Sequence, residues 1–143
     1  MGLDKVSHYQ PFKIFHYQLF EREWYFNIDK AIELCELAKE AGFTPITVSR
    51  ASQENILKIN YVNDKYVDNA DETKPGIAIQ IEDERVAEGL FYILIDGTHR
   101  CAKAYKLNKD WSAFFLEKRA YDVIKLTDEE IAQFTKYKEI FGE

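Results

Sequence analysis

A short apolar run that stops at Asp-Gly and continues into a helix-forming segment is the most informative stretch of this sequence. Residues 91–95 are all apolar or aromatic, and the turn that follows consists of Asp96, Gly97, Thr98, His99 and Arg100. An apolar run bounded by a glycine predicts a buried strand and a tight turn. A helix that begins directly after the turn points unpaired backbone N–H groups at the space above it. We therefore expect a strand–turn–helix unit with an anion-binding end.

Each residue of this turn has a structural and a functional interpretation. Gly97 permits a sharp turn and a close approach of a ligand. Thr98 is expected to cap the helix or to contact a phosphate. His99 and Arg100 stand where a helix disfavours cations, so an anionic ligand or a nearby carboxylate should offset them. Asp96 is a candidate general base, a candidate Mg²⁺ ligand, or a cap of the helix.

The composition limits the classes of protein to which this chain can belong. Its 143 residues suffice for one domain with a core, and 46% of them are hydrophobic, which argues against a disordered protein. The 25 acidic and 19 basic residues give a net charge of −6, which disfavours duplex-DNA binding by general phosphate neutralisation. We expect a cytoplasmic protein, because the sequence shows neither a membrane-span stretch nor a signal peptide.

The remaining periodic segments predict short strands and helices in a mixed order. Strands are expected at residues 12–19, 43–49, 76–81, 91–95, 111–116 and 121–124. Helices are expected from a cap at Asn27 or Asp29 to about residue 41, from a cap at Ser52 to residue 59, and at residues 98–107. The strands 76–81 and 91–95 should form a hairpin with a loose loop. This order predicts an α+β domain.

Two features near the ends of the chain carry further predictions. Thr127 and Glu130 have the spacing of a capping box, which predicts a C-terminal helix from residue 127 to residue 143. Eight aromatic residues lie between residues 8 and 26, and they are expected either to pack in the core or to cover a partner surface. Cys35 and Cys101 lack metal-ligand spacing, and Cys35 is expected to be a core residue.

The residues around the turn resemble a known superfamily. Residues 92–105, Tyr-Ile-Leu-Ile-Asp-Gly-Thr-His-Arg-Cys-Ala-Lys-Ala-Tyr, are similar to the signature of the ParB/sulfiredoxin superfamily. In its members a strand, a Gly-x-[His/Arg]-Arg turn and a helix place nucleotide phosphates on the turn. Residues 74–81 resemble the preceding strand, which typically begins after a proline, and residues 111–116 resemble the following strand.

The resemblance is good over residues 74–116 and looser from residue 44 onward. It implies a ParB/sulfiredoxin-like small mixed sheet with helices packed on it, in a single domain over residues 1–143. Residues 1–43 are then an N-terminal extension outside the match, and residues 127–143 form an added C-terminal helix.

The superfamily contains several activities that differ in this turn. Sulfiredoxins carry Gly-Cys-His-Arg with a reactive cysteine, whereas this chain has Thr98 at that place and Cys101 after the arginine. ParB partition proteins carry Gly-Glu-Arg-Arg and a following helix-turn-helix domain. The nearest pattern is the Asp-Gly-His-His-Arg of stand-alone members that include free-serine kinases. By that resemblance Asp96 is the catalytic base or an Mg²⁺ contact, and the phosphates of ATP, ADP or CTP are held by Gly97, Thr98, His99 and Arg100.

Three hypotheses about function follow. The first is a nucleotide-binding protein that supports phosphoryl transfer or nucleotide hydrolysis, with Glu54 as a candidate second carboxylate or else a solvated helix residue. The second is a ParB-like nuclease of a mobile element, whose phosphate site would hold a DNA backbone although the net charge of −6 counts against it. The third is a non-catalytic interaction module that keeps the fold alone.

Overall fold

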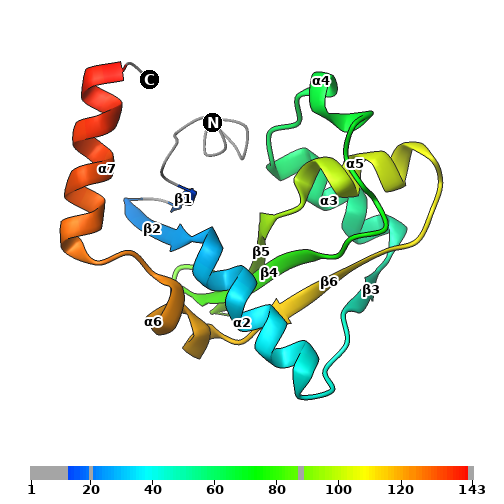
Figure 1. Ribbon diagram of the computed structural model, residues 1–143, viewed down its shortest axis with the longest axis horizontal. Helices are drawn as coiled ribbons and strands as arrows, with labels where there is room; N and C mark the ends of the chain where they lie inside the picture. The colour runs from blue at the N-terminus through cyan, green and yellow to red at the C-terminus, as the bar shows by residue number, and fades with distance from the viewer. Residues whose placement is uncertain (1–12, 20, 87–88, 142–143) are drawn as a thin grey trace.

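The apolar strands in the middle of the chain meet in one mixed four-stranded sheet with the order β3-β6-β4-β5 (Figure 1). The computed structural model describes residues 13–19, 21–86 and 89–141. Strands β4 (Gly76–Glu82) and β5 (Leu90–Asp96) form the predicted antiparallel hairpin. Strand β6 (Trp111–Leu116) is parallel to β4, and β3 (Ile46–Val48) pairs with the other side of β6.

The aromatic stretch near the N-terminus forms a second, two-stranded sheet. Strand β1 (Ile14–Leu19) agrees with the prediction, but β2 (Arg22–Asn27), its antiparallel partner, was not predicted. Phe15, Trp24 and Phe26 are buried, so the prediction of core packing is confirmed for these three residues. The predictions for Tyr9, Phe12 and Phe20 lie outside the described residues.

Four helices occupy the segments between the strands. Helix α2 (Ile28–Glu40) is capped by Asn27, whose side chain accepts a hydrogen bond from the Lys30 N–H at 3.1 Å. Helix α3 (Arg50–Ile59), the short α4 (Asp64–Val67) and α5 (Thr98–Lys106) lie together on one side of the sheet (Figure 1). The N-cap of α3 is Ser49, which accepts from the Ser52 N–H, so the prediction of Ser52 as the cap was wrong.

The predicted strand at residues 121–124 was wrong. These residues form helix α6 (Tyr121–Ile124), which follows the 3₁₀ turn η1 (Lys118–Ala120). Ile124 is fully buried and the Tyr121 ring packs edge-on against Phe26 at 5.4 Å, whereas Val123 is 58% exposed. Side chains three apart therefore share one face, which is the period of a helix and not of a strand.

The C-terminal helix α7 (Asp128–Phe141) begins with the predicted capping box. The Thr127 N–H donates to Glu130 Oε1 at 2.9 Å, and the Glu130 N–H donates to Thr127 Oγ1 at 3.1 Å. Phe134 of this helix is buried together with Leu126 and Ile14, which docks α7 beside the β1–β2 hairpin (Figure 1).

Both faces of the four-stranded sheet are buried. Alternate residues of β4 and β5 point to opposite faces, as the strand period requires. One face packs on the hairpin, α2 and α6 through Ile79, Ile81, Ile93 and Ile95. The other face packs on α5 through Ala78 and Leu94. The coarse prediction of an α+β arrangement with a mixed sheet and helices packed on it is confirmed.

Two glycines bring the start of β4 against the end of β5. Gly97 has φ +102°, and a Cβ atom there would lie 2.9 Å from Gly76 Cα and 3.1 Å from the Trp111 ring. A Cβ on Gly76 would lie 2.5 Å from the same ring. Trp111 thus covers a contact between two backbones that any side chain would force apart.

We predict that Gly97→Ala destabilises the protein by about 3 kcal/mol, because it combines left-handed strain with overpacking. Gly42→Ala is the matched control, since Gly42 has φ +95° but nothing within 4 Å of its missing Cβ. That change should cost about 1 kcal/mol, from strain alone. Urea unfolding of both variants measures the difference. Equal losses would show that the contact with Trp111 and Gly76 relaxes without cost.

Candidate functional site

Asp96 and Arg100 line one pocket of about 330 Å³ between α2 and the start of β4. Asp96 is the last residue of β5 and Arg100 lies in the first turn of α5, so the strand–turn–helix unit presents both side chains to the same space. Apolar residues from α2, β4 and β6 form its walls, and its polar and charged members are Cys35, Glu36, Lys39, Lys74, Asp96 and Arg100.

Asp96 and Arg100 form an ion pair, with 3.5 Å between Arg100 Nη1 and Asp96 Oδ2. Nη1 also donates a hydrogen bond to the Pro75 carbonyl at 3.0 Å. A neighbouring carboxylate, one of the two alternatives raised for Arg100, therefore offsets the cation at the start of the helix. Both side chains keep about a quarter of their surface exposed, 29% for Arg100 and 25% for Asp96, so the pair remains accessible from the pocket.

Burial raises the pKa of the Asp96 carboxyl above its ordinary value, although Arg100 and the Gly97 N–H act in the opposite direction. A carboxylate that is held in a pocket and is more basic than usual suits the role of general base. This geometry is compatible with the role predicted for Asp96.

Two lysines that sequence reasoning did not single out complete the charged part of the pocket. Lys39 lies near the end of α2, and Lys74 lies two residues before β4. Both are exposed, and neither amine forms an ion pair with another residue in the described part of the chain. With Arg100 they make three cations against the two carboxylates of Asp96 and Glu36, a local excess of one positive charge on an acidic protein.

Thr98 points away from this pocket. Its side chain is buried, and its hydroxyl accepts a hydrogen bond from Asn60 Nδ2 at 3.0 Å. The same amide donates to the Leu94 carbonyl at 3.2 Å. Gly97 occupies the N-cap position and Thr98 is the first helical residue, so the prediction of Thr98 as the cap was wrong. The hydroxyl holds the segment after α3 in place.

His99 also contacts the segment that follows α3. Its Nε2 accepts a hydrogen bond from the Asn63 N–H at 3.1 Å, and its ring lies edge-on to Tyr66 at 5.6 Å. Both contacts hold the His99 ring against the segment that follows α3. The turn is therefore divided: Asp96 and Arg100 line the pocket, while Thr98 and His99 hold α4 and its flanking loop.

Glu54 lies on the exposed surface of α3 and does not line the pocket of Asp96. The second carboxylate at the pocket is Glu36 of α2 instead. No local sequence pattern indicates Glu36, Lys39 or Lys74, because they come from two segments far from the turn. In the sequence these side chains are typical of a solvent-exposed surface, and the tertiary structure places them at one pocket.

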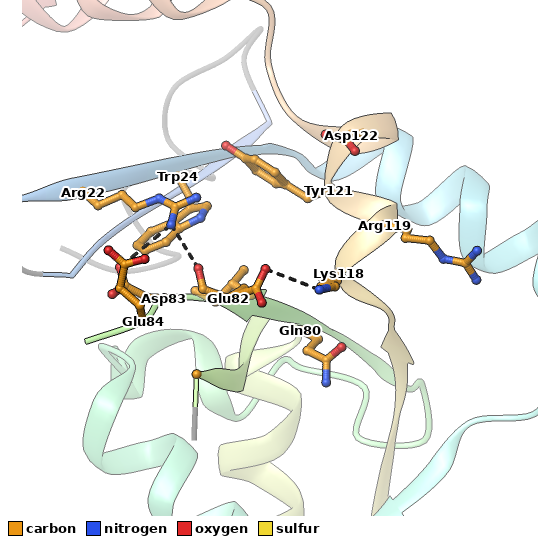
Figure 2. Close-up of a pocket in the computed structure, with 12 residues that line it drawn as sticks. Arg22, Trp24, Gln80, Glu82, Asp83, Glu84, Lys118, Arg119, Tyr121 and Asp122 are labelled. Atoms are coloured by element: carbon orange, nitrogen blue, oxygen red, sulfur yellow. Dashed lines mark hydrogen bonds and ion pairs between the residues drawn. The ribbon is translucent and has the colours of Figure 1, made fainter. Parts of the chain in front are cut away.

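A larger cavity of about 550 Å³ lies between β2, the end of β4 and the η1–α6 segment (Figure 2). Arg22 stacks over Trp24 at 4.7 Å and donates to the Glu82 carbonyl at 3.0 Å, and Lys118 pairs with the Glu82 carboxylate at 3.3 Å. Figure 2 shows that Arg119 points away from these residues. The cations directed into this cavity already have partners within the protein, which makes it a weaker candidate for an anionic ligand.

Neither described cysteine is reactive in this environment. Cys35 and Cys101 are both buried, and burial raises their thiol pKa values to about 11 and about 12 respectively. The prediction of Cys35 as a core residue is confirmed, although its side chain also borders the pocket of Asp96. Both thiols stay protonated at neutral pH.

No protein-family model, curated protein or solved structure matches this chain. Within the described residues, no group of three or more His, Cys, Asp or Glu side chains is placed to hold a metal ion. No helix in that part of the chain has both the length and the apolar character needed to cross a membrane.

We predict that the Asp96 carboxyl titrates above its ordinary pKa of 3.8 and that Arg100→Met raises the pKa further, because Arg100 stabilises the ionised form. Carbon-detected NMR of the carboxyl group measures both values. Lys106→Met is the control, since Lys106 lies on the same helix but pairs with Asp68. A titration of Asp96 below 3.8 would contradict the burial argument.

The raised pKa also has a consequence for stability. A carboxyl whose pKa is higher in the folded state disfavours folding once it ionises, and this penalty is absent below the unfolded-state value of 3.8. Asp96→Asn should therefore raise the melting temperature at pH 7, and the difference should shrink as the pH falls towards 4. Thermal unfolding at several pH values tests this. A variant less stable than the native chain at pH 7 would show that the ion pair with Arg100 outweighs the burial of Asp96.

Proposed function

We propose that this chain binds a nucleotide, of the ATP, ADP or CTP class, by its phosphates at the pocket of Asp96 and Arg100. The observation that carries the proposal is the gathering of Arg100, Lys39 and Lys74 around the half-buried carboxylate of Asp96, at the start of a helix. Cations and a helix N-terminus are the groups that proteins use to bind phosphate. The proposal also rests on the resemblance of residues 74–116 to the ParB/sulfiredoxin superfamily, whose fold we propose for this chain.

Because the side chains of the turn point in two directions, fewer of them are available to hold the phosphates. Thr98 and His99 are engaged with the segment after α3, so the phosphates would contact Arg100 and the two lysines instead of all four turn residues. A volume of about 330 Å³ is at the small end for ligand pockets. It suits phosphates and a small acceptor, with the nucleoside at the mouth of the pocket.

Phosphoryl transfer to a small hydroxyl-bearing acceptor is the reaction that this arrangement would support. Such reactions depend on positioning and charge neutralisation more than on covalent chemistry. Asp96, with its raised pKa, would accept the proton of the attacking hydroxyl, and Arg100 would neutralise charge on the transferred phosphoryl group. Mg²⁺ would enter with the nucleotide and would be held by its phosphates.

Isothermal titration with ATP, ADP and CTP, each with Mg²⁺, tests the proposal. We expect binding, and we expect the double variant Lys39→Ala/Lys74→Ala to bind about tenfold more weakly because two cations of the pocket are lost. Lys106→Ala is the matched control, since it removes an exposed lysine that lies outside the pocket. Absence of binding at millimolar nucleotide, or an equal loss in the control, would overturn the proposal.

Asp96→Asn separates binding from catalysis. If Asp96 acts as the base, this variant should retain nucleotide binding but lose phosphoryl transfer to a panel of small alcohols by a factor of about 100 or more. With ATP as the donor, the amount of phosphorylated alcohol formed beside ADP measures the transfer. An unchanged rate would remove Asp96 from the reaction.

A further inference from the structure

We propose that an extended segment of another polypeptide inserts between β1 and β5 and joins the two sheets of this protein. The two strands belong to different sheets and are not hydrogen-bonded to one another. A cavity of about 500 Å³ lies between them, and the C-terminal end of α3 closes one side of it. This site is separate from the pocket of Asp96.

The cavity borders the edges of both strands. It is lined by residues 15–18 of β1 and residues 91–94 of β5, which are consecutive runs of four. Successive side chains point to opposite faces of a strand, so a cavity against a face would be lined by every second residue. Consecutive residues place the cavity beside the backbone edge, where N–H and C=O groups lie.

Hydrogen bonds elsewhere in the hairpin show which groups β1 presents to the cavity. The Tyr25 carbonyl accepts from the Leu126 N–H at 3.2 Å, so the backbone groups of Tyr25 point away from β1. His16 is directly opposite Tyr25, and both members of such a pair point outward in an antiparallel ladder. The backbone of His16 therefore faces the edge of β1 that no other described strand pairs with, and so does that of Gln18 two residues later.

Strand β5 is an edge strand of the larger sheet and also turns backbone groups toward the cavity. The Leu94 carbonyl accepts from Asn60 Nδ2 at 3.2 Å and thus points away from β4. Tyr92 lies two residues earlier in the same regular register, so its N–H and C=O also face outward. Asn60 covers one end of this edge and sets where an added strand would stop.

An extended backbone is the ligand that matches two such edges. It carries donors and acceptors on both of its sides, with a repeat equal to that of the flanking strands. Four residues of each strand span about 13 Å, so the inserted segment would be about four residues long. An inserted strand would place β1, the segment and β5 in one continuous sheet.

The side chains around the cavity define the chemistry of the segment. On one face Phe15, Tyr17, Phe91 and Ile93 belong to or pack on the main core. On the other side Ile59, Tyr61 and Tyr92 are 70%, 50% and 48% exposed although they line the cavity. Lys58 is the cation among the lining residues, apart from the titratable His16. The segment should therefore be apolar on both faces and carry an acidic residue opposite Lys58.

Amide hydrogen exchange on the full chain tests whether the two edges are open. We expect the amides of His16, Gln18 and Tyr92 to exchange rapidly in the free protein. Slow exchange at every protein concentration would mean that the chain itself fills the cavity. Protection that increases with concentration would mean that a second copy does. Either result would overturn the proposal.

A library of random heptapeptides displayed on phage, selected against the full chain, provides the probe. We expect enriched peptides to be apolar with an acidic residue, to protect His16, Gln18 and Tyr92 from exchange, and to lose about tenfold in affinity with Lys58→Glu. Ile59→Asp should weaken binding similarly, whereas Ile46→Asp, on the far edge strand β3 where Ile46 is 59% exposed, should not. Failure to enrich any peptide that needs Lys58 or Ile59 would overturn the proposal.

Backbone N-methylation of a selected peptide separates insertion from addition to one edge. A strand inserted between two edges donates hydrogen bonds to alternate sides, so methylation at each interior position should weaken binding. A strand added to one edge would be sensitive at every second position. An alternating pattern would overturn insertion.

Discussion

The contact of Gly76 and Gly97 beneath the Trp111 ring is the constraint on which the site depends. A Cβ atom on either glycine would lie within about 3 Å of the other backbone or of the ring. The Trp111 Nε1–H donates to the Lys74 carbonyl at 3.2 Å, which holds the segment before β4 against the sheet. Because these backbones touch, the Pro75 carbonyl comes within hydrogen-bond distance of Arg100. The turn that we predicted to be a binding site is therefore also a packing element.

The two sides of helix α5 contact different parts of the protein. Arg100 faces the pocket and pairs with Asp96, while Thr98, His99 and Lys103 hold the segment between α3 and β4 that contains α4. Lys103 Nζ donates to the carbonyls of Asp68 and Ala70 at 3.0 and 2.9 Å. The residues of this segment that lie outside α4 need such partners for their backbone groups. Much of the polar character of this helix therefore serves the loop and leaves Arg100 as its contribution to the pocket.

The arrangement of the two sheets explains why, among the described residues, strand edges without a pairing strand lie beside the core. The β1–β2 hairpin covers one face of the larger sheet through Phe15, Trp24 and Phe26, but it does not extend that sheet. Exposed edges are usually protected by charge, proline or bulges. At β5 the Asn60 side chain takes one carbonyl, and the neighbouring positions of the edge stay next to a cavity.

The sequence by itself determined the elements with strong local patterns. The capping box of Thr127 and Glu130, the hairpin of β4 and β5, and the strand–turn–helix unit at Gly97 all form as predicted, because each depends on neighbours within a few residues. The strand at β2 was missed and residues 121–124 were misassigned. Short apolar segments fit both periods, and burial against Phe26 and its neighbours selects between them.

The tertiary structure decided which of the candidate residues share a site. Asp96 and Arg100 meet because they are four residues apart across a strand–helix junction, a relation that the sequence already contains. Lys39, Lys74 and Glu36 join them through long-range packing of α2 and β4, which no local pattern encodes. Thr98 and His99 turn away because Asn60 and Asn63, more than 30 residues distant, offer them hydrogen bonds. Local patterns therefore located the turn, and long-range packing decided which of its side chains line the pocket.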